Sequence, residues 1–491
     1  MTDRPLLLAV DQGTSATKAL LVDGTGAVVA SASAPLSVDH PRPGWVEQSP
    51  GQIWDSVVEA VGKCLAGHDP ARVAGVGLST QRESCLLWER ATGRPLGTLL
   101  GWQDRRTADR CAELLADGAG DDVRAVTGLP LDPMFSALKA QWLLDTHDPD
   151  RSRSRRGELC LGTVDSWLLW RLSDGAEHVV EVGNAARTQL LDVRTRDWDA
   201  DLLDLFDVPR EVLPRITPST GPFPAVRGLA PLADGTPVAA VLGDSHAALF
   251  GHGVFVPGSV KVTYGTGSSV MGLIAGPDRA AGSPLCLTLA WDDGTPAYAL
   301  EGNIRSSGAT LRWLAGLLGT DEADLAARAA PDSAGVRLVP AFGGLAAPWW
   351  DNDATGLLCG LTFATGLPQL ARAALESVAF QVEDVVAGLD TASGRVGALL
   401  ADGGATDNAA LMQLQADTSG RVVRRPRARD VSALGAAHLA GCALGVFTKD
   451  RLAGLARAED VHRPRGTAAE RERALASWHE AVARARGHRG P

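Results

Sequence analysis

The stretch LLLAVDQGTSATKALLV, residues 6–22, decides the fold. It is an apolar run that ends at Asp11, then a polar turn that contains glycine, then a second apolar run. Two β-type runs joined by such a turn predict a β-hairpin. Residues 260–274, VKVTYGTGSSVMGLI, repeat the pattern in the second half of the chain. We therefore expect two related halves that each begin with a hairpin, with the two turns on opposite sides of a cleft.

Outside the hairpins, short β runs alternate with helical patterns, which indicates an α/β fold. Buried strands are expected at residues 73–79 and 396–402. The helical patterns cover residues 136–145, 367–389 and 407–418, and a surface helix with a loose tail is expected over residues 465–489. The arginine-rich run at residues 151–156 is interpreted as a solvated loop, as most charge runs are.

The composition excludes several classes of protein. At 491 residues the chain is too long for one hydrophobic core, and 45% hydrophobic with 21% charged residues is typical of a globular protein. A net charge of −11 argues against nucleic acid as a partner. Seven cysteines without a C-x-x-C pair argue against a zinc site or a disulfide framework. Without a signal peptide or a membrane-length apolar run, we expect a cytoplasmic protein with no membrane partner.

The two hairpin turns carry residues suited to phosphate. Phosphoryl transfer needs a cradle for phosphates, a divalent cation and a carboxylate near the acceptor hydroxyl. Asp11 stands at the end of a strand beside the donors of Gly13 and Thr14, and this arrangement can hold a metal ion and a phosphate together. Alone it also fits a simple tight hairpin. The second copy, around Thr266, favours phosphate because its glycines allow close backbone approach.

Two further segments place polar groups after apolar strands. Gly404 and Asn408 lie between a strand and a helix, where small residues could admit an adenine ring, although a plain strand-to-helix turn fits equally. Asp244 ends another apolar run and could accept a proton from a substrate hydroxyl, or cap a helix, or do both. His246 is more readily a packed or capping residue than a catalytic base.

Arg82 and Glu83 follow the strand at residues 73–79. Adjacent donor and acceptor side chains suit vicinal hydroxyl groups, while a surface ion pair is the alternative. Trp102 could offer an apolar face to a carbon chain, or be an ordinary half-buried tryptophan.

Taken together, these motifs resemble the FGGY carbohydrate kinases, and among them most closely the glycerol kinases. The resemblance runs from Leu6 to Thr448. Its ordered motifs occupy residues 11–14, 81–83, 102–106, 128–136, 161–168, 243–251, 263–267, 298–302, 344–351, 356–361, 369–376 and 402–405.

The resemblance implies two actin-like, ribonuclease H-like ATPase domains, residues 1–246 and 247–491, facing a central cleft. It implies ATP and Mg²⁺, a small polyol or sugar as acceptor, and a homodimer or homotetramer. Asp244 would be the general base, and Asp11 and Asp244 would contact the metal. The nucleotide positions are Thr14, Ser15, Lys18, Thr266, Gly308, Arg312, Gly404 and Asn408. The acceptor positions are Arg82, Glu83, Trp102, Met134, Asp244 and Ser245.

Several positions depart from the glycerol kinase pattern. Met134, Ser245 and Ser269 stand where tyrosine, glutamine and phenylalanine are usual. Lys18 replaces an arginine and so loses a fork of donors, and Arg312 replaces a glutamine. The smaller pocket residues suit a longer polyol or a ketose at least as well as glycerol.

Three functions are therefore weighed. A glycerol or related polyol kinase is supported by Arg82 and Glu83, and a ketose kinase of the xylulokinase type by the altered pocket positions. An actin-like nucleotide-binding protein without kinase activity is the third, and the retained Asp244 argues against it. We expect no sugar bisphosphate regulation, because residues 228–236 lack the glycine-rich loop that binds this effector in some bacterial glycerol kinases.

Overall fold

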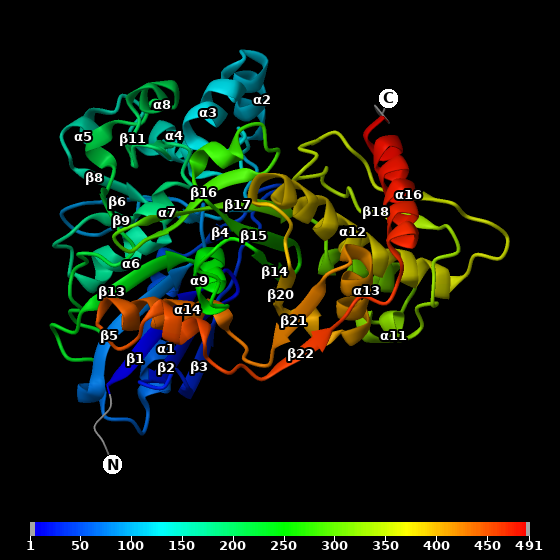
Figure 1. Cartoon of the computed structure of the whole chain (residues 1–491). Helices are drawn as coiled ribbons and strands as arrows, with labels where there is room; N and C mark the ends of the chain where they lie inside the picture. The colour runs from blue at the N-terminus through cyan, green and yellow to red at the C-terminus, as the bar shows by residue number, and fades with distance from the viewer. Residues whose placement is uncertain (1–4, 488–491) are drawn as a thin grey trace. The chain divides into compact units, whose positions relative to one another are not determined.

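A computed structural model describes residues 5–487, which form two compact units (Figure 1). The first unit comprises the chain up to residue 255 together with residues 287–299 and 430–455. The second comprises residues 256–286, 300–429 and the chain from residue 456 onward. Each unit is thus built from three separate segments of the chain. The domain boundary between residues 246 and 247 stays a prediction. No helix among residues 5–487 has the length and apolarity needed to cross a bilayer.

The first unit is built on a sheet with the strand order β13-β5-β1-β2-β3. The predicted hairpin is β1 (Leu6–Gln12) and β2 (Ala16–Asp23), with Leu8 opposite Leu21. β3 (Val28–Pro35) continues the antiparallel side. On the other side β5 (Val73–Thr80) and β13 (Val238–Gly243) run parallel to β1. Helix α1 (Pro50–Leu65) packs against β2 and β3 with its apolar face.

Helices α9 (Asp244–Gly251) and α14 (Val431–Ala443) pack closely in the first unit through glycine. A Cβ atom on Gly435 would lie 1.8 Å from the carbonyl oxygen of Ala247. On β5, a Cβ on Gly77 would lie 2.2 Å from the carbonyl oxygen of Ala436. Side chains at these two glycines would push the helix away, so the close approach requires glycine.

The second unit is built on a seven-stranded sheet with the order β16-β17-β15-β14-β20-β21-β22, in which β16 (Cys286–Asp292) is an edge strand. Within it, β21-β20-β14-β15-β17 repeats the order of the first sheet. Its hairpin is β14 (Ser259–Tyr264) and β15 (Ser268–Ile274). β20 (Ala398–Asp402) runs parallel to β14, β21 (Val422–Pro426) runs parallel to β20, and β22 (Glu459–His462) closes this side antiparallel. β17 (Pro296–Ile304) lies beyond β15. The expectation of two related halves that each start from a hairpin is confirmed.

Helix α12 (Leu367–Ser393) is the long helix of the second unit and packs against α10 (Gly308–Leu317) and α13 (Ala409–Ser419). The last helix, α16 (Ala468–Gly487, red in Figure 1), is anchored to α12. Trp478 stacks on Phe380 with ring centroids 5.4 Å apart, and its indole N–H donates to Asp384 over 2.8 Å. A buried carboxylate and an aromatic pair therefore fix this helix.

The remaining elements connect these two sheets. In the first unit they are β4 (Glu47–Gln48), β6 (Leu86–Glu89), β7 (Leu99–Leu100), α2 (Ala108–Ala116), α3 (Ala119–Thr127), α4 (Ser136–His147), α5 (Ser152–Arg155), β8 (Leu159–Gly162), α6 (Val164–Leu172), β9 (Val179–Glu181), α7 (Val182–Ala185), β10 (Leu191–Asp192), β11 (Asp197–Trp198), α8 (Ala200–Leu205), β12 (Arg215–Thr217) and α15 (Lys449–Ala453). The others are α11 (Glu322–Ala327), β18 (Arg337–Val339) and β19 (Leu357–Cys359), with short 3₁₀ turns at residues 70–72, 210–212, 277–280 and 404–407.

The expected strands and helices are confirmed with shifts of a few residues at their ends. The interpretation of residues 151–156 as a solvated loop is wrong in two respects. Residues 152–155 form α5, and Arg151 is 1% exposed. Its guanidinium donates to backbone carbonyls of Asp148 and Asp207 and pairs with Asp145. One arginine of the run is therefore a buried structural residue. The helix predicted within residues 465–489 is α16, and residues 488 and 489 of that stretch lie outside the described residues.

Candidate active site

Three parallel strands of the first unit end at the same edge of its sheet. Asp11 on β1 pairs with Ser79 on β5, and Gly243 on β13 pairs with Thr80. The residues that follow these positions, among them Arg82 and Asp244, are thereby brought to one edge. Ligands of parallel sheets bind at this carboxyl end of the strands.

Asp11 is held in the edge by its neighbour on β5. The Ser79 hydroxyl donates to Oδ1 of Asp11 over 2.6 Å. Burial raises the pKa of Asp11 to about 6, the Ser79 hydrogen bond opposes this, and the charge of Asp244 raises it further. Asp244 is therefore close enough to Asp11 to disfavour its ionisation, and a cation placed between the two carboxylates would relieve this repulsion.

Asp244 is the first residue of α9 and follows Gly243 directly. Its Oδ1 accepts the backbone N–H of Ser245 over 2.6 Å and Nε of Arg82 over 3.2 Å. The side chain is 41% exposed. The carboxylate is thus oriented by two donors and by the helix N-terminus, yet a small molecule can reach it. The interpretation of Asp244 as the helix cap is wrong, because Gly243 is the N-cap of α9 and, among the described residues, no side chain caps this helix.

Arg82 is 5% exposed and passes close to β13. A Cβ on Gly243 would lie 2.5 Å from its Cδ, so glycine is required there. Nη1 of Arg82 also lies 3.4 Å from Nε2 of His246. The same His246 nitrogen lies 3.2 Å from the hydroxyl of Thr288. His246 is fully buried and packs behind Arg82, as the packed interpretation expected. Arg82 and Asp244 therefore form a fixed ion pair, and the surface pair considered from sequence is excluded by burial of the arginine.

Glu83 adopts a left-handed backbone with φ 62° and turns its side chain inward. Its Oε1 accepts Nε of Arg187 over 2.6 Å, and Arg187 is fully buried. The guanidinium carbon also lies 5.2 Å from the ring centroid of Phe135. Sequence reasoning did not select Arg187. It lies in the Ala-rich segment after α7, and only its pairing with a distant glutamate distinguishes it.

Trp102 and Met134 lie on loops beside this pair. The Trp102 indole N–H donates to the Thr14 hydroxyl over 3.0 Å, so residues predicted for acceptor and nucleotide meet here. The Trp102 backbone N–H donates to the Ser84 hydroxyl over 3.1 Å. Met134 is half-buried, and its N–H donates to Asp132 over 2.9 Å. The loops are thus fixed by hydrogen bonds at their backbones.

The remaining predicted residues of the first unit lie near β2. Lys18 lies opposite Asp11 in the register of β1 and β2, and its ammonium donates to Oδ1 of Asp430 over 2.6 Å. Burial lowers the pKa of Lys18, but Asp430 outweighs this and the net pKa is raised. Ser15 is exposed at the hairpin turn, and Ser245 is buried on α9. Asp430 was not selected from sequence.

In the second unit the Gly265–Gly267 turn is clamped onto the start of α10. The N–H groups of Gly308 and Ala309 donate to the carbonyls of Gly265 and Thr266, each over 3.0 Å. A Cβ on Gly308 would lie 2.7 Å from the Gly265 oxygen. Thr266 and Gly308 are therefore brought together, and their role toward a nucleotide stays a prediction.

Gly403 and Gly404 follow β20, which pairs with β14. Gly403 has φ +93°, and its Cβ would lie 2.3 Å from the Tyr264 oxygen, whereas a Cβ on Gly404 would meet open space. Asn408 caps α13 by accepting the N–H of Leu411 over 3.0 Å. These residues form one turn at the strand end.

Two residues of the second unit have local partners of their own. Arg312 pairs with Glu322 over 2.9 Å, and both side chains are exposed. Ser269 donates to Glu301 over 2.9 Å and accepts from Lys261 over 3.1 Å.

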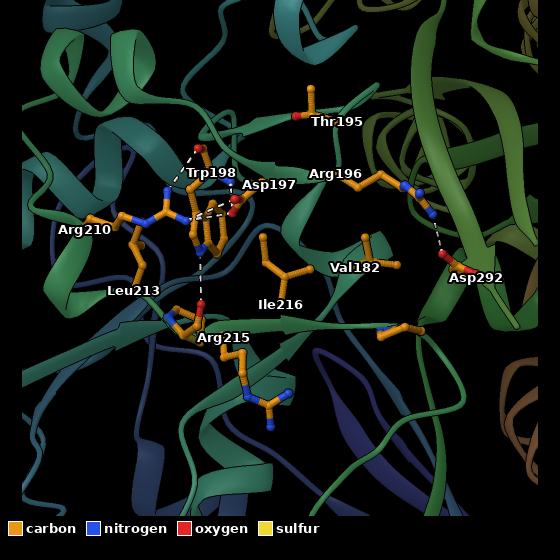
Figure 2. Close-up of a pocket in the computed structure, with 12 residues that line it drawn as sticks. Val182, Thr195, Arg196, Asp197, Trp198, Arg210, Leu213, Arg215, Ile216 and Asp292 are labelled. Atoms are coloured by element: carbon orange, nitrogen blue, oxygen red, sulfur yellow. Dashed lines mark hydrogen bonds and ion pairs between the residues drawn. The ribbon is translucent and has the colours of Figure 1, made fainter. Parts of the chain in front are cut away.

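A separate pocket of about 660 Å³ lies in the first unit (Figure 2). Arg196 and Arg210 lie on opposite sides of it, with Ile216 between them. These arginines pair with Asp292 over 2.8 Å and Asp197 over 2.9 Å. A third lining arginine, Arg215, pairs with Glu177 over 3.1 Å. None of the residues predicted for the active site lines this pocket.

The comparisons with known proteins decide the family. The model of the FGGY family of carbohydrate kinases, N-terminal domain, matches residues 6–251, and that of the C-terminal domain matches residues 260–444. The chain belongs to the FGGY family of carbohydrate kinases. The kinase is 44% identical to a glycerol kinase of Aromatoleum aromaticum over 490 residues, which covers 98% of this chain and 99% of the relative.

A second relative of the same identity carries another name. The kinase is also 44% identical to an apulose kinase of Pectobacterium atrosepticum over 490 residues, with 98% of each chain covered. Among solved structures, the glycerol kinase of Plasmodium falciparum with ADP superposes with a TM-score of 0.89, 28% identity and 98% coverage of both chains. The prediction of an α/β fold with two actin-like, ribonuclease H-like domains is confirmed, and so is the prediction of a phosphotransferase that acts on a sugar or sugar alcohol.

Proposed function

We propose that this kinase transfers the terminal phosphoryl group of ATP to a hydroxyl group of glycerol or a closely related polyol. The observation that carries the proposal is Asp244, a reachable carboxylate oriented by Arg82 and by the start of α9. A carboxylate so placed can accept the proton of the attacking hydroxyl. The full-length similarity to glycerol kinases supports glycerol as the first candidate.

The acceptor would be bound by the residues around Asp244. Arg82 donates to hydroxyl oxygens, and Glu83, held by Arg187, accepts from hydroxyl groups. Trp102 and Met134 provide apolar surface for the carbon chain, and Ser245 lines the start of α9. Because Arg82 and Glu83 are anchored before substrate arrives, little ordering would be needed on binding.

Asp11 and Asp244 fit a role toward Mg²⁺. Among residues 5–487 no group of three or more His, Cys, Asp or Glu side chains forms a metal site. Mg²⁺ is, however, commonly held by one or two carboxylates together with water and substrate phosphates. The charge of Asp244, which raises the pKa of Asp11, supports such a pair. When bound, the ion neutralises charge on the transferring phosphoryl group.

The nucleotide would use backbone groups and a few side chains. Thr14, Ser15 and Lys18 at the first hairpin are proposed for phosphate, as is Thr266 at the second. Gly308, Gly404 and Asn408 are proposed for the remainder of the nucleotide, with Arg312 at its edge. We further propose a cytoplasmic homodimer or homotetramer, on the family resemblance alone.

Gly403→Ala and Gly404→Ala test the nucleotide role as a matched pair. Gly403→Ala places Cβ against the Tyr264 oxygen in a left-handed backbone, so its unfolding free energy should fall by ~2 kcal/mol or more. Gly404→Ala enters open space and should keep the melting temperature. If the nucleotide packs against Gly404, the KM of the Gly404→Ala variant for ATP should rise about tenfold, which corresponds to ~1.4 kcal/mol of binding free energy. An unchanged KM for ATP in the stable Gly404→Ala variant would contradict the role.

A ketose kinase is the second candidate. The apulose kinase is as similar as the glycerol kinase, at 44% identity. Met134, Ser245 and Ser269 stand where glycerol kinases typically have tyrosine, glutamine and phenylalanine. The smaller side chains at these positions leave room for a longer acceptor, so they favour the ketose alternative.

The acceptor is tested by coupled ADP release with glycerol, erythritol, threitol, arabinitol, xylulose, ribulose and apulose. We expect the highest kcat/KM with glycerol or a four-carbon polyol, because Arg82 and Glu83 together suit vicinal hydroxyl groups. A ketose that exceeds every polyol would establish the second candidate. Release of ADP at the acceptor-free rate with the whole panel would contradict both.

A further inference from the structure

Lys139 is a fully buried lysine on the first turn of α4. Its ammonium donates to the carbonyl oxygen of Gly101 over 3.0 Å and to that of Met134 over 2.7 Å. These carbonyls belong to different loops. Gly101 precedes Trp102, and Met134 closes the turn that leads into α4.

The same helical turn reaches a third loop. The hydroxyl of Ser136, three residues before Lys139, donates to the backbone carbonyl of Glu83 over 3.0 Å. The first turn of α4 therefore contacts the three segments that carry Glu83, Trp102 and Met134.

We propose that Lys139 is a positioning residue for the acceptor, which holds the loops of Trp102 and Met134 at a fixed spacing beside Glu83. The inference rests on the acceptor site proposed above. It adds a residue that does not touch the substrate but sets how well the substrate is bound.

The charge of Lys139 is compensated in a way that suits this role. A buried ammonium is costly unless it is paired and hydrogen-bonded, and here two carbonyls accept from it. Burial lowers the pKa of Lys139 to about 8, against the charges of Glu83, Asp104 and Asp132, which raise it. Burial also raises the pKa of the Cys85 thiol to about 12, so this neighbour stays protonated near neutral pH.

The pH dependence follows from this balance. Below pH 8 Lys139 is charged and both hydrogen bonds are charge-assisted, which makes them stronger than neutral ones. As the pH rises through 8 the proton is lost and the clamp weakens. The KM for the acceptor should then rise about tenfold between pH 7 and pH 9, with the KM for ATP changing less than twofold.

Lys139→Met removes the charge and both donors while keeping the unbranched stem. We expect the KM for the acceptor at pH 7 to rise 10- to 100-fold, roughly the loss of one or two charge-assisted hydrogen bonds. Its pH dependence between 7 and 9 should be flat. Acceptor-independent ATP hydrolysis and the KM for ATP should stay within twofold. Lys63→Met, at an exposed helix position, should match the wild type.

The outcomes separate this inference from the proposed function. If Lys139→Met does not fold, Lys139→Gln, which keeps a donor on an unbranched stem, replaces it, and an unchanged acceptor KM in that variant overturns the clamp. A folded variant with an unchanged acceptor KM, or with equal losses for ATP and acceptor, overturns it too. Neither result touches the assignment of Asp244, which is tested separately by its amide variant.

Discussion

Asp244→Asn is expected to lower kcat by about 10³-fold, within the range for loss of a general base. Asparagine keeps the shape of the side chain and can still accept the N–H of Ser245, so α9 should begin as before. It cannot accept a proton from the substrate hydroxyl near neutral pH. The loss should therefore fall on the chemical step, measured by coupled ADP release at saturating ATP and acceptor.

Binding of nucleotide provides the internal control for this variant. Titration calorimetry should give an affinity for ADP without added metal within about twofold of the wild type, since no proton transfer is involved. Asp69→Asn serves as the matched replacement, because Asp69 is an exposed capping residue that asparagine can replace. Near-normal turnover in Asp244→Asn would remove the central residue of the proposed mechanism.

The hairpins were predictable because their signals are local. Asp11 and its turn lie within one short stretch of sequence, and the alternation of apolar runs with a glycine turn specifies a hairpin without distant contacts. The repeat around Thr266 follows the same logic. The identities of the strands that pair beside each hairpin depend on contacts far along the chain, which a single sequence does not state.

The candidate site shows where local reasoning ends. Arg82 and Asp244 are 162 residues apart and were each selected for their position after a strand, but their pairing follows only from the parallel register of β5 and β13. Arg187 and Lys139 were missed because nothing in their neighbours marks them as buried charges. Each is explained by a partner on another segment, Glu83 for one and two loop carbonyls for the other.

Arg151 illustrates the converse error. A run of arginine and serine was interpreted as one solvated segment, although its first residue points inward. The left-handed backbone at Arg151, with φ 58°, directs its side chain to carbonyl groups of Asp148 and Asp207. Average charge describes a segment, whereas burial is decided residue by residue through available hydrogen-bond acceptors.

Arg82→Ala should mainly weaken acceptor binding. The guanidinium is almost fully buried and is proposed to donate to the acceptor hydroxyls, so the KM for the acceptor should rise about 100-fold, equivalent to ~3 kcal/mol. Acceptor-independent ATP hydrolysis should be retained, because the residues proposed for the phosphates are those of the hairpin turns, whereas Arg82 is proposed for the acceptor. An equal loss of ATP hydrolysis would argue against an acceptor role. Arg82→Lys, which keeps the charge but not the planar donors, should recover only part of the affinity.

A double-mutant cycle separates the two roles of Arg82. Beyond binding the acceptor, its Nε holds Oδ1 of Asp244, so part of its effect on kcat should pass through that carboxylate. In the Asp244→Asn background this part is already lost, and Arg82→Ala should then reduce kcat by much less than in the wild type. Additive losses in kcat would mean that Arg82 acts independently of Asp244, whereas residues in direct contact are expected to couple by ~0.5–3 kcal/mol. The effect on acceptor KM, by contrast, should persist in both backgrounds, because it depends on the donors that face the substrate.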